Sequence, residues 1–147
     1  MKRLYKTSGF LLLAVAVLAN VLSSCSSSRR SIPVEEGWEL IGEEKVNFVR
    51  DKDEVIVTSR NQFTDIRFRV EEREVRIQDL KIYFENGDKL EPSIDLVVFA
   101  NRDSRNIELA QDGRIISKIE FTYRTTGNLL KGRANVLIYG KRHTLGF

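Results

Sequence analysis

The sequence predicts an all-β fold, a single antiparallel β-sandwich of about eight or nine strands. Two stretches, "DIRFRVEE" and "KIEFTYR", alternate apolar and polar side chains with a period of two, which is typical of half-buried strands. Turn signals that contain glycine are present in "ENGD" and "QDGR". The predicted strand centres lie mostly about 8–12 residues apart, a spacing found in sandwiches and barrels, so a closed β-barrel is the alternative.

The chain begins with a segment, residues 1–24, that has the layout of a secretory signal peptide. A basic start, "MKRLYK", precedes an apolar run from Phe10 to Ala19, and the small residues Ser23 and Ser24 come after it. The apolar run is too short for a permanent transmembrane helix, which needs roughly 20 residues. We therefore expect this segment to be removed on export, and a membrane-spanning helix is the alternative.

Cys25, the only cysteine of the chain, comes directly after this segment. The residues Leu22–Cys25 resemble the lipobox of bacterial lipoproteins. The resemblance implies a diacylglycerol thioether on Cys25, cleavage before it, and usually an acyl chain such as palmitate on the new amine. Two or three acyl chains hold a protein stably at a membrane. We expect a lipoprotein of the cell envelope, anchored to the outer membrane or the cell membrane with its domain outside the cytoplasm; an ordinary cleaved signal with a chance cysteine is the alternative.

The segment 25–37 predicts a flexible, lipidated tether, because "SSSRRSIPVEEG" is polar and has no apolar periodicity.

The net charge of the chain depends on whether the segment before Cys25 is counted. The formal net charge of +3 suggests nucleic-acid binding. However, its excess is carried by Lys2, Arg3 and Lys6, and without them 21 basic side chains face 21 acidic ones. We therefore expect no nucleic-acid partner.

The sandwich domain is predicted to span residues 38–147. Besides the two alternating stretches, the predicted strands are Glu39–Ile41, Lys45–Val49, Glu54–Ser59, Glu74–Gln78, Leu80–Phe84, Ser93–Phe99, Asn106–Leu109 and Ala134–Tyr139. Type I′ turns are predicted at Asn86-Gly87 and Asp112-Gly113, since both pairs tolerate positive φ angles. A longer connection, Thr125–Arg133, is expected to expose the apolar residues Leu129 and Leu130.

The domain resembles a β-sandwich found in exported bacterial proteins of unknown function. The residues that carry the resemblance are core and turn positions spread over about 100 residues: Trp38, Gly42, Asn86-Gly87, "SRNIEL" from Ser104, "RIISKIEFTYR" from Arg114, Ala134, Val136 and Gly140. The resemblance implies the fold and the compartment. It implies no catalytic residues.

Catalytic and metal-binding chemistry finds little support in the sequence. Structural zinc needs about four Cys or His ligands, and the chain offers Cys25 and His143. His143, four residues from the last residue of the sequence, is expected on a frayed end, and no G-x-S-x-G nucleophile motif is present. "DKDE", Asp51–Glu54, could form a weak calcium site, although a solvated charged turn is the preferred interpretation. We expect no enzyme activity and no cofactor.

Binding is the function that remains, and a non-catalytic module that contacts another envelope protein is the leading hypothesis. A glycan- or anionic-lipid-binding domain is the alternative, and a hydrolase that uses surface carboxylates is a further one. Tyr83 is predicted to be the most exposed aromatic residue, and outward arginines could grip anionic groups through bidentate contacts. The candidate binding residues are therefore Tyr83, Arg67, Arg69, Arg76 and Arg124, with additional arginines near loops at Arg102, Arg105, Arg114 and Arg133. Cross-strand pairing with acidic residues is the structural alternative for these arginines.

Overall fold

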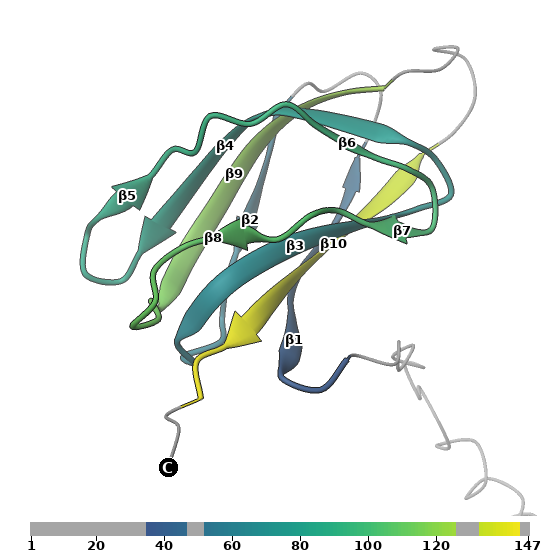
Figure 1. The fold of residues 1–147 in the computed structure, drawn as a ribbon. Coiled ribbons are helices and arrows are strands. Elements are labelled where there is room, and N and C mark those ends of the chain that lie inside the picture. The colour runs from purple at the N-terminus through teal and green to yellow at the C-terminus, as the bar shows by residue number, and fades with distance from the viewer. Residues whose placement is uncertain (1–34, 47–51, 126–132, 145–147) are drawn as a thin grey trace, which may run out of the picture. The chain divides into compact units, whose positions relative to one another are not determined.

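The computed structural model describes residues 35–46, 52–125 and 133–144 (Figure 1). The predicted signal peptide, Cys25, most of the predicted tether and the Leu129-Leu130 pair lie outside the described residues. The strands are β1 (Trp38–Val46), β2 (Lys52–Ile56), β3 (Phe63–Glu71), β4 (Val75–Phe84), β5 (Lys89–Leu90), β6 (Leu96–Val98), β7 (Arg102–Asp103), β8 (Ile107–Glu108), β9 (Ile116–Thr125) and β10 (Ala134–Arg142).

The strands form two five-stranded sheets that face each other (Figure 1). Sheet A has the order β1-β10-β3-β7, with β8 also paired to β3, and sheet B has the order β2-β9-β4-β5, with β6 also paired to β4. All pairings between named strands are antiparallel. The predicted sandwich is confirmed, and the described strands do not close into a barrel. The described part of the chain contains no helix with the length and hydrophobicity needed to cross a membrane.

The core lies between the sheets and is built from the alternating strands that the sequence predicts. Ile66, Phe68 and Val70 of β3 are fully buried, and Phe121 of β9 is 1% exposed. The rings of Phe68 and Phe121 meet edge to face across the two sheets, with their centroids 5.8 Å apart. Burying a side chain of this size stabilises the fold by about 1.5–3 kcal/mol, so the contact joins the two sheets firmly.

Two predicted strand breaks are wrong, because each is a register shift within one continuous strand. β1 runs without interruption from Trp38 to Val46, with an irregularity between Leu40 and Gly42. β4 likewise continues through a shift between Ile77 and Asp79. A bulge adds one residue to a strand and thereby reverses which side chains point inward. The interrupted alternation therefore resembles the end of a strand in the sequence.

The predicted type I′ turns are also wrong, although both turns occur where they are expected. A type I′ turn needs positive φ at both central residues, whereas only the glycines, Gly87 at 88° and Gly113 at 73°, are positive here. The amide of Gly87 donates to the carbonyl of Phe84 at 3.1 Å, and that of Gly113 to the carbonyl of Ala110 at 3.1 Å. Each turn thus closes on a glycine at its fourth position.

Lys52–Glu54, the described part of "DKDE", begins a strand and is not a charged turn. β2 begins at Lys52, two residues before the predicted strand, and alternation turns Asp53 inward and Glu54 outward. Asp53 is 9% exposed, and its carboxylate accepts a hydrogen bond from the hydroxyl of Tyr123 at 2.8 Å. The expected frayed end at His143 is wrong too, because its amide donates to the carbonyl of Gln62 at 2.8 Å.

The registers define two ends of the sandwich. At one end, which we call the tether end because the predicted tether would join there, Trp38 of β1 lies opposite Lys141 of β10, and Arg142 lies opposite Phe63, the first residue of β3. At the far end, β3 finishes beside the link between β6 and β7, where Val70 bridges Ala100. The described chain therefore joins the sandwich at the end that also holds the start of β3.

Candidate functional site

The outer face of sheet B carries an ion network centred on Glu120. Its carboxylate accepts a hydrogen bond from the Lys118 ammonium at 2.8 Å and pairs with Lys52 at 2.8 Å. Lys118 also reaches Glu54 at 3.2 Å. The two lysines cover Glu120, which is 9% exposed, and their hydrogen bonds lower the pKa of its carboxyl to about 2. These lysines and carboxylates are engaged with one another and leave little charge for a ligand.

On the outer face of sheet A, the side chain of Arg67 packs against two aromatic rings. The Arg67 guanidinium carbon lies 4.2 Å from the ring centroid of Trp38 and 5.8 Å from that of Tyr139. Arg67 also donates to the Glu35 carboxylate at 2.9 Å, which joins the segment before β1 to β3. Tyr139 is 3% exposed, and burial raises the pKa of its hydroxyl. The guanidinium of Arg67 is therefore engaged by contacts within the fold.

The predicted binding residues do not form one cluster. Arg67 and Arg69 lie on sheet A, whereas Arg76, Tyr83 and Arg124 lie on sheet B. Arg69 donates to Asp103 at 3.0 Å, and the two residues are direct partners across β3 and β7. The ring of Tyr83 is half-buried beneath the Lys118 ammonium, 4.5 Å from the ring centroid. A single aromatic and cationic surface through all five residues is therefore not formed.

Four residues at the far end of sheet B form an exposed surface that we call the β6 patch: Arg76, Val97, Phe99 and Arg124. Arg76 lies directly opposite Val97 on one side and opposite Arg124 on the other. Val97 is 39% exposed and Phe99 58% exposed. Arg76 grips Asp95 with two hydrogen bonds, which lower the pKa of that carboxyl. Arg124 forms no ion pair with a described residue.

The sequence predicts two residues of the β6 patch, the arginines, but not its apolar part. Arg76 and Arg124 are candidate residues from the outset, and a strand over Ser93–Phe99 is expected. The exposure of Phe99 was missed, because a strand end gives no signal of which face is covered. Alternation with the buried Val98 could have placed Val97 and Phe99 on the outer face.

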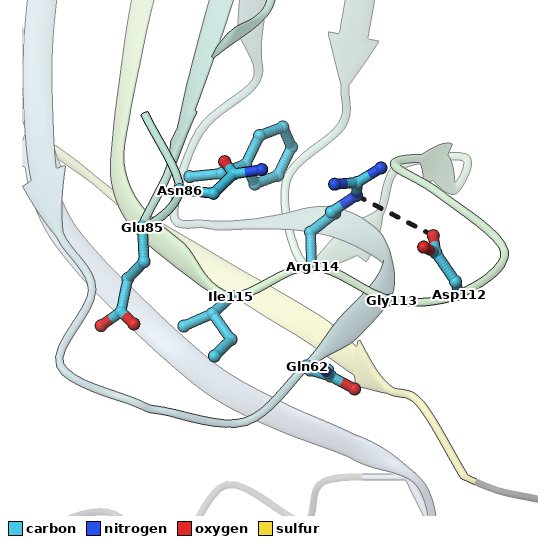
Figure 2. Close-up of a pocket in the computed structure, with 8 residues that line it drawn as sticks. Gln62, Glu85, Asn86, Asp112, Gly113, Arg114 and Ile115 are labelled. Carbon is cyan, nitrogen blue, oxygen red and sulfur yellow. Dashed lines mark ion pairs between the residues drawn. The ribbon is translucent and has the colours of Figure 1, made fainter. Parts of the chain in front are cut away.

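A polar cleft of about 480 Å³ lies between the turns at the tether end (Figure 2). We call it the loop cleft, and its lining residues come from the start of β3, the β4–β5 turn and the β8–β9 turn: Gln62, Phe84, Glu85, Asn86, Asp112, Gly113, Arg114 and Ile115. Figure 2 shows the Arg114 guanidinium reaching toward the Asp112 carboxylate, 3.8 Å away. Asn86 and Arg114 point to one side of the backbone, whereas Glu85 and Ile115 point to the other.

The carboxylates of the predicted calcium segment are not brought together. Asp53 points inward to Tyr123, and Glu54 points outward to Lys118, while Asp51 lies outside the described residues. Within the described ranges, no group of three or more His, Cys, Asp or Glu residues has a geometry that could hold a metal ion.

The fold and these surfaces define a small all-β domain whose strand charges are largely paired with one another. The chain belongs to the family described as a domain of unknown function, DUF2541, whose profile matches residues 11–140. No curated protein matches the sequence. Among solved structures, the chain is similar to a chain from the structural and functional characterization of Pseudomonas aeruginosa AlgX, with 13% identity and a TM-score of 0.44. The similarity covers 71% of this chain and 27% of the AlgX chain.

Proposed function

We propose that this protein is a lipoprotein of the cell envelope, anchored through Cys25, whose sandwich is a non-catalytic module that binds an acidic segment of another envelope protein. The observation that carries the proposal is the β6 patch. It combines an apolar pair, Val97 and Phe99, with two arginines, of which Arg76 pairs with Asp95 and Arg124 forms no ion pair with a described residue. Other outward charges on the same sheet are neutralised within the fold.

The chemistry of the partner follows from the charge imbalance of the patch. Like charges directly opposite each other on a sheet destabilise it, so the Arg76–Arg124 pair has no folding benefit. A carboxylate of a partner would neutralise Arg124, and an apolar side chain of the same segment would cover Phe99. Exposed aromatic residues and arginines are the residue types that contribute most binding energy in protein interfaces.

The position of the β6 patch suits a module held at its other end. The tether would join the sandwich at Trp38, whereas Phe99 lies beyond the opposite end of β3. Nine residues of a strand such as β1 span about 30 Å, so the patch would face away from the anchoring membrane.

The docking surface is tested by photo-crosslinking of the full chain in its own cells. A photo-reactive amino acid replaces Phe99 in one variant and, as a control, Ile56 in another, because Ile56 is 61% exposed on β2 of the same sheet. We expect position 99 to crosslink to an acidic peptide segment, identified by mass spectrometry. The Arg124→Glu change should reduce the yield about tenfold or more, which corresponds to one lost charged contact.

Three outcomes would overturn the proposal: equal crosslinking from position 56, a crosslinked segment without acidic residues, or a yield that Arg124→Glu does not change. Circular dichroism of the Arg124→Glu protein checks that its fold is retained. The anchor has its own arm, in which Cys25→Ala should move the protein out of the membrane fraction. A processed Cys25→Ala protein that stays with the membranes contradicts the lipid anchor and leaves the docking result to stand separately.

A further inference from the structure

The walls of the loop cleft are fixed by backbone hydrogen bonds between distant segments. The amide of Glu85 donates to the carbonyl of Ile115 at 3.0 Å. Phe63 and Arg114 exchange two bonds, of 2.8 and 2.9 Å. The turns that carry the polar lining side chains are therefore held in place before any ligand arrives, and a preformed site loses less entropy on binding.

Arg114 has donors that the fold does not use. Its guanidinium lies 3.8 Å from Asp112 and 3.9 Å from Asp88, both too far for a hydrogen bond. No hydrogen bond joins the guanidinium to any described residue, although its side chain is only 38% exposed. A guanidinium has five N–H donors in a fixed plane. A ligand hydroxyl beside this cluster can therefore accept from the guanidinium and donate to a neighbouring carboxylate.

Asn86 adds a second oriented polar group on the same side of the cleft (Figure 2). Its amide nitrogen donates to the Asp88 carboxylate at 2.7 Å, and its oxygen accepts from the Asp88 amide at 3.0 Å. The side chain is thus locked at both atoms. One N–H and one lone pair remain free, since an amide group offers two of each.

The charges of the loop cleft select a neutral ligand with hydroxyl groups. A hydroxyl both donates and accepts, so adjacent hydroxyls match a carboxylate that stands beside a guanidinium. An anionic ligand would be repelled by Asp88 and Asp112, which outnumber the one guanidinium beside them, and a cation has no acceptor for the unused N–H donors of Arg114. We propose that the loop cleft binds a neutral saccharide through Asn86, Asp112 and Arg114. Its volume of about 480 Å³ lies in the range of small-molecule sites, roughly 300–1,000 Å³.

This site goes beyond the proposed docking function, because it lies at the tether end and uses none of the residues of the β6 patch. A module anchored to a membrane and holding envelope glycan beside its tether would be fixed in place at two points. Either site can fail without affecting the other.

The test uses the full ¹⁵N-labelled chain in detergent, with backbone amide shifts as the readout. The probes are three neutral tetrasaccharides (of N-acetylglucosamine, of β-linked glucose and of α-linked glucose), one tetrasaccharide of galacturonate, and calcium chloride alone. We expect at least one neutral probe to shift the amides of Asn86, Gly113 and Arg114 with a dissociation constant of about 1 mM, typical of weak specific binding. Galacturonate and calcium should shift them less.

The variants separate the cleft from the general charge of this end. Arg114→Gln should weaken binding about tenfold or more, the effect of one lost charged hydrogen bond. The matched control is Arg60→Gln, which removes an equal charge from the same end. Arg60 is 85% exposed, does not line the cleft, and pairs with Glu85, whose side chain points to the other side of the backbone from Arg114. Shifts confined to other surfaces, no shift with any neutral probe, a stronger response to galacturonate or calcium, or equal losses in both variants would each overturn the proposal.

Discussion

Gly42 shows how one residue positions two sheets. A Cβ atom at this position would overlap Cγ1 of Val55, so the backbone of β1 lies directly against a β2 side chain. Gly140 has the same role in sheet A, because a Cβ atom there would lie 2.5 Å from the Phe63 ring. Both glycines belong to the residues that carry the family resemblance, and close packing is the physical reason that they occupy these positions.

The Gly42→Ala change should destabilise the protein by about 1–3 kcal/mol, because a methyl group is forced into a filled space. The companion change Val55→Ala removes the atom that it meets. The double variant should therefore lose less free energy of unfolding than the two single losses combined. Urea unfolding of all four proteins measures this coupling, and strictly additive losses would refute the close approach.

At the scale of elements, the two glycine turns allow a direct comparison. Gly87 and Gly113 both have positive φ, yet a Cβ atom at Gly87 meets nothing within 4 Å. A Cβ atom at Gly113 would lie 2.8 Å from that of His143 and 3.0 Å from that of Gln62. The β4–β5 turn is thus constrained by its own backbone alone, whereas the β8–β9 turn is also constrained by packing against β10 and the start of β3.

Gly87→Ala should cost about 1–2 kcal/mol, the penalty of a left-handed conformation with a side chain. Gly113→Ala should cost at least about 1 kcal/mol more, because the packing conflict adds to the same penalty. Thermal unfolding followed by circular dichroism compares the two variants side by side. Equal melting temperatures would show that the β8–β9 turn moves freely away from His143.

Most of the strands can be predicted from the sequence, whereas the residues at which they begin, end or bulge cannot. The alternation of Ile66, Phe68 and Val70 predicts β3 because the side-chain direction in a strand depends on local geometry alone. The bulge at Leu40 and Gly42 lies instead in the pairing with β10, where the Gly42 backbone also packs against Val55 of β2, and both contacts join segments that are distant in the sequence. The type I′ turns were predicted from residue preference, whereas the hairpins place only their glycines at positive φ.

At the scale of the whole molecule, the ion network of sheet B predicts the behaviour in acid. Glu120 has a pKa of about 2 in the folded protein, against an ordinary value of 4.5. A carboxyl with a lowered folded pKa stabilises the fold at pH values above its unfolded pKa, and this stabilisation is lost as the pH falls toward the folded pKa. The contribution of Glu120 should therefore disappear between about pH 4.5 and pH 2.

The Glu120→Gln variant should be less stable than the wild type at neutral pH, and the gap should narrow as the pH falls to about 2. Urea unfolding at several pH values across this window measures the gap. The control is Glu43→Gln on β1, whose side chain is exposed and has no ion pair with a described residue. A gap between wild type and Glu120→Gln that stays constant with pH would show that the ion network does not hold Glu120 ionised.

The sequence by itself determined the all-β class, the sandwich and the approximate positions of its turns, because period-two alternation and glycine turns are local properties. Only the tertiary structure decided which polar side chains are paired with each other. Arg67 meets Glu35 across 32 residues, Arg76 meets Asp95 across 19, and Tyr123 meets Asp53 across 70. Such pairs depend on strand order and register, which bring distant segments together. For the same reason, the β6 patch is visible only once β4 is paired with β6 and β9, and the loop cleft only once both sheets are assembled.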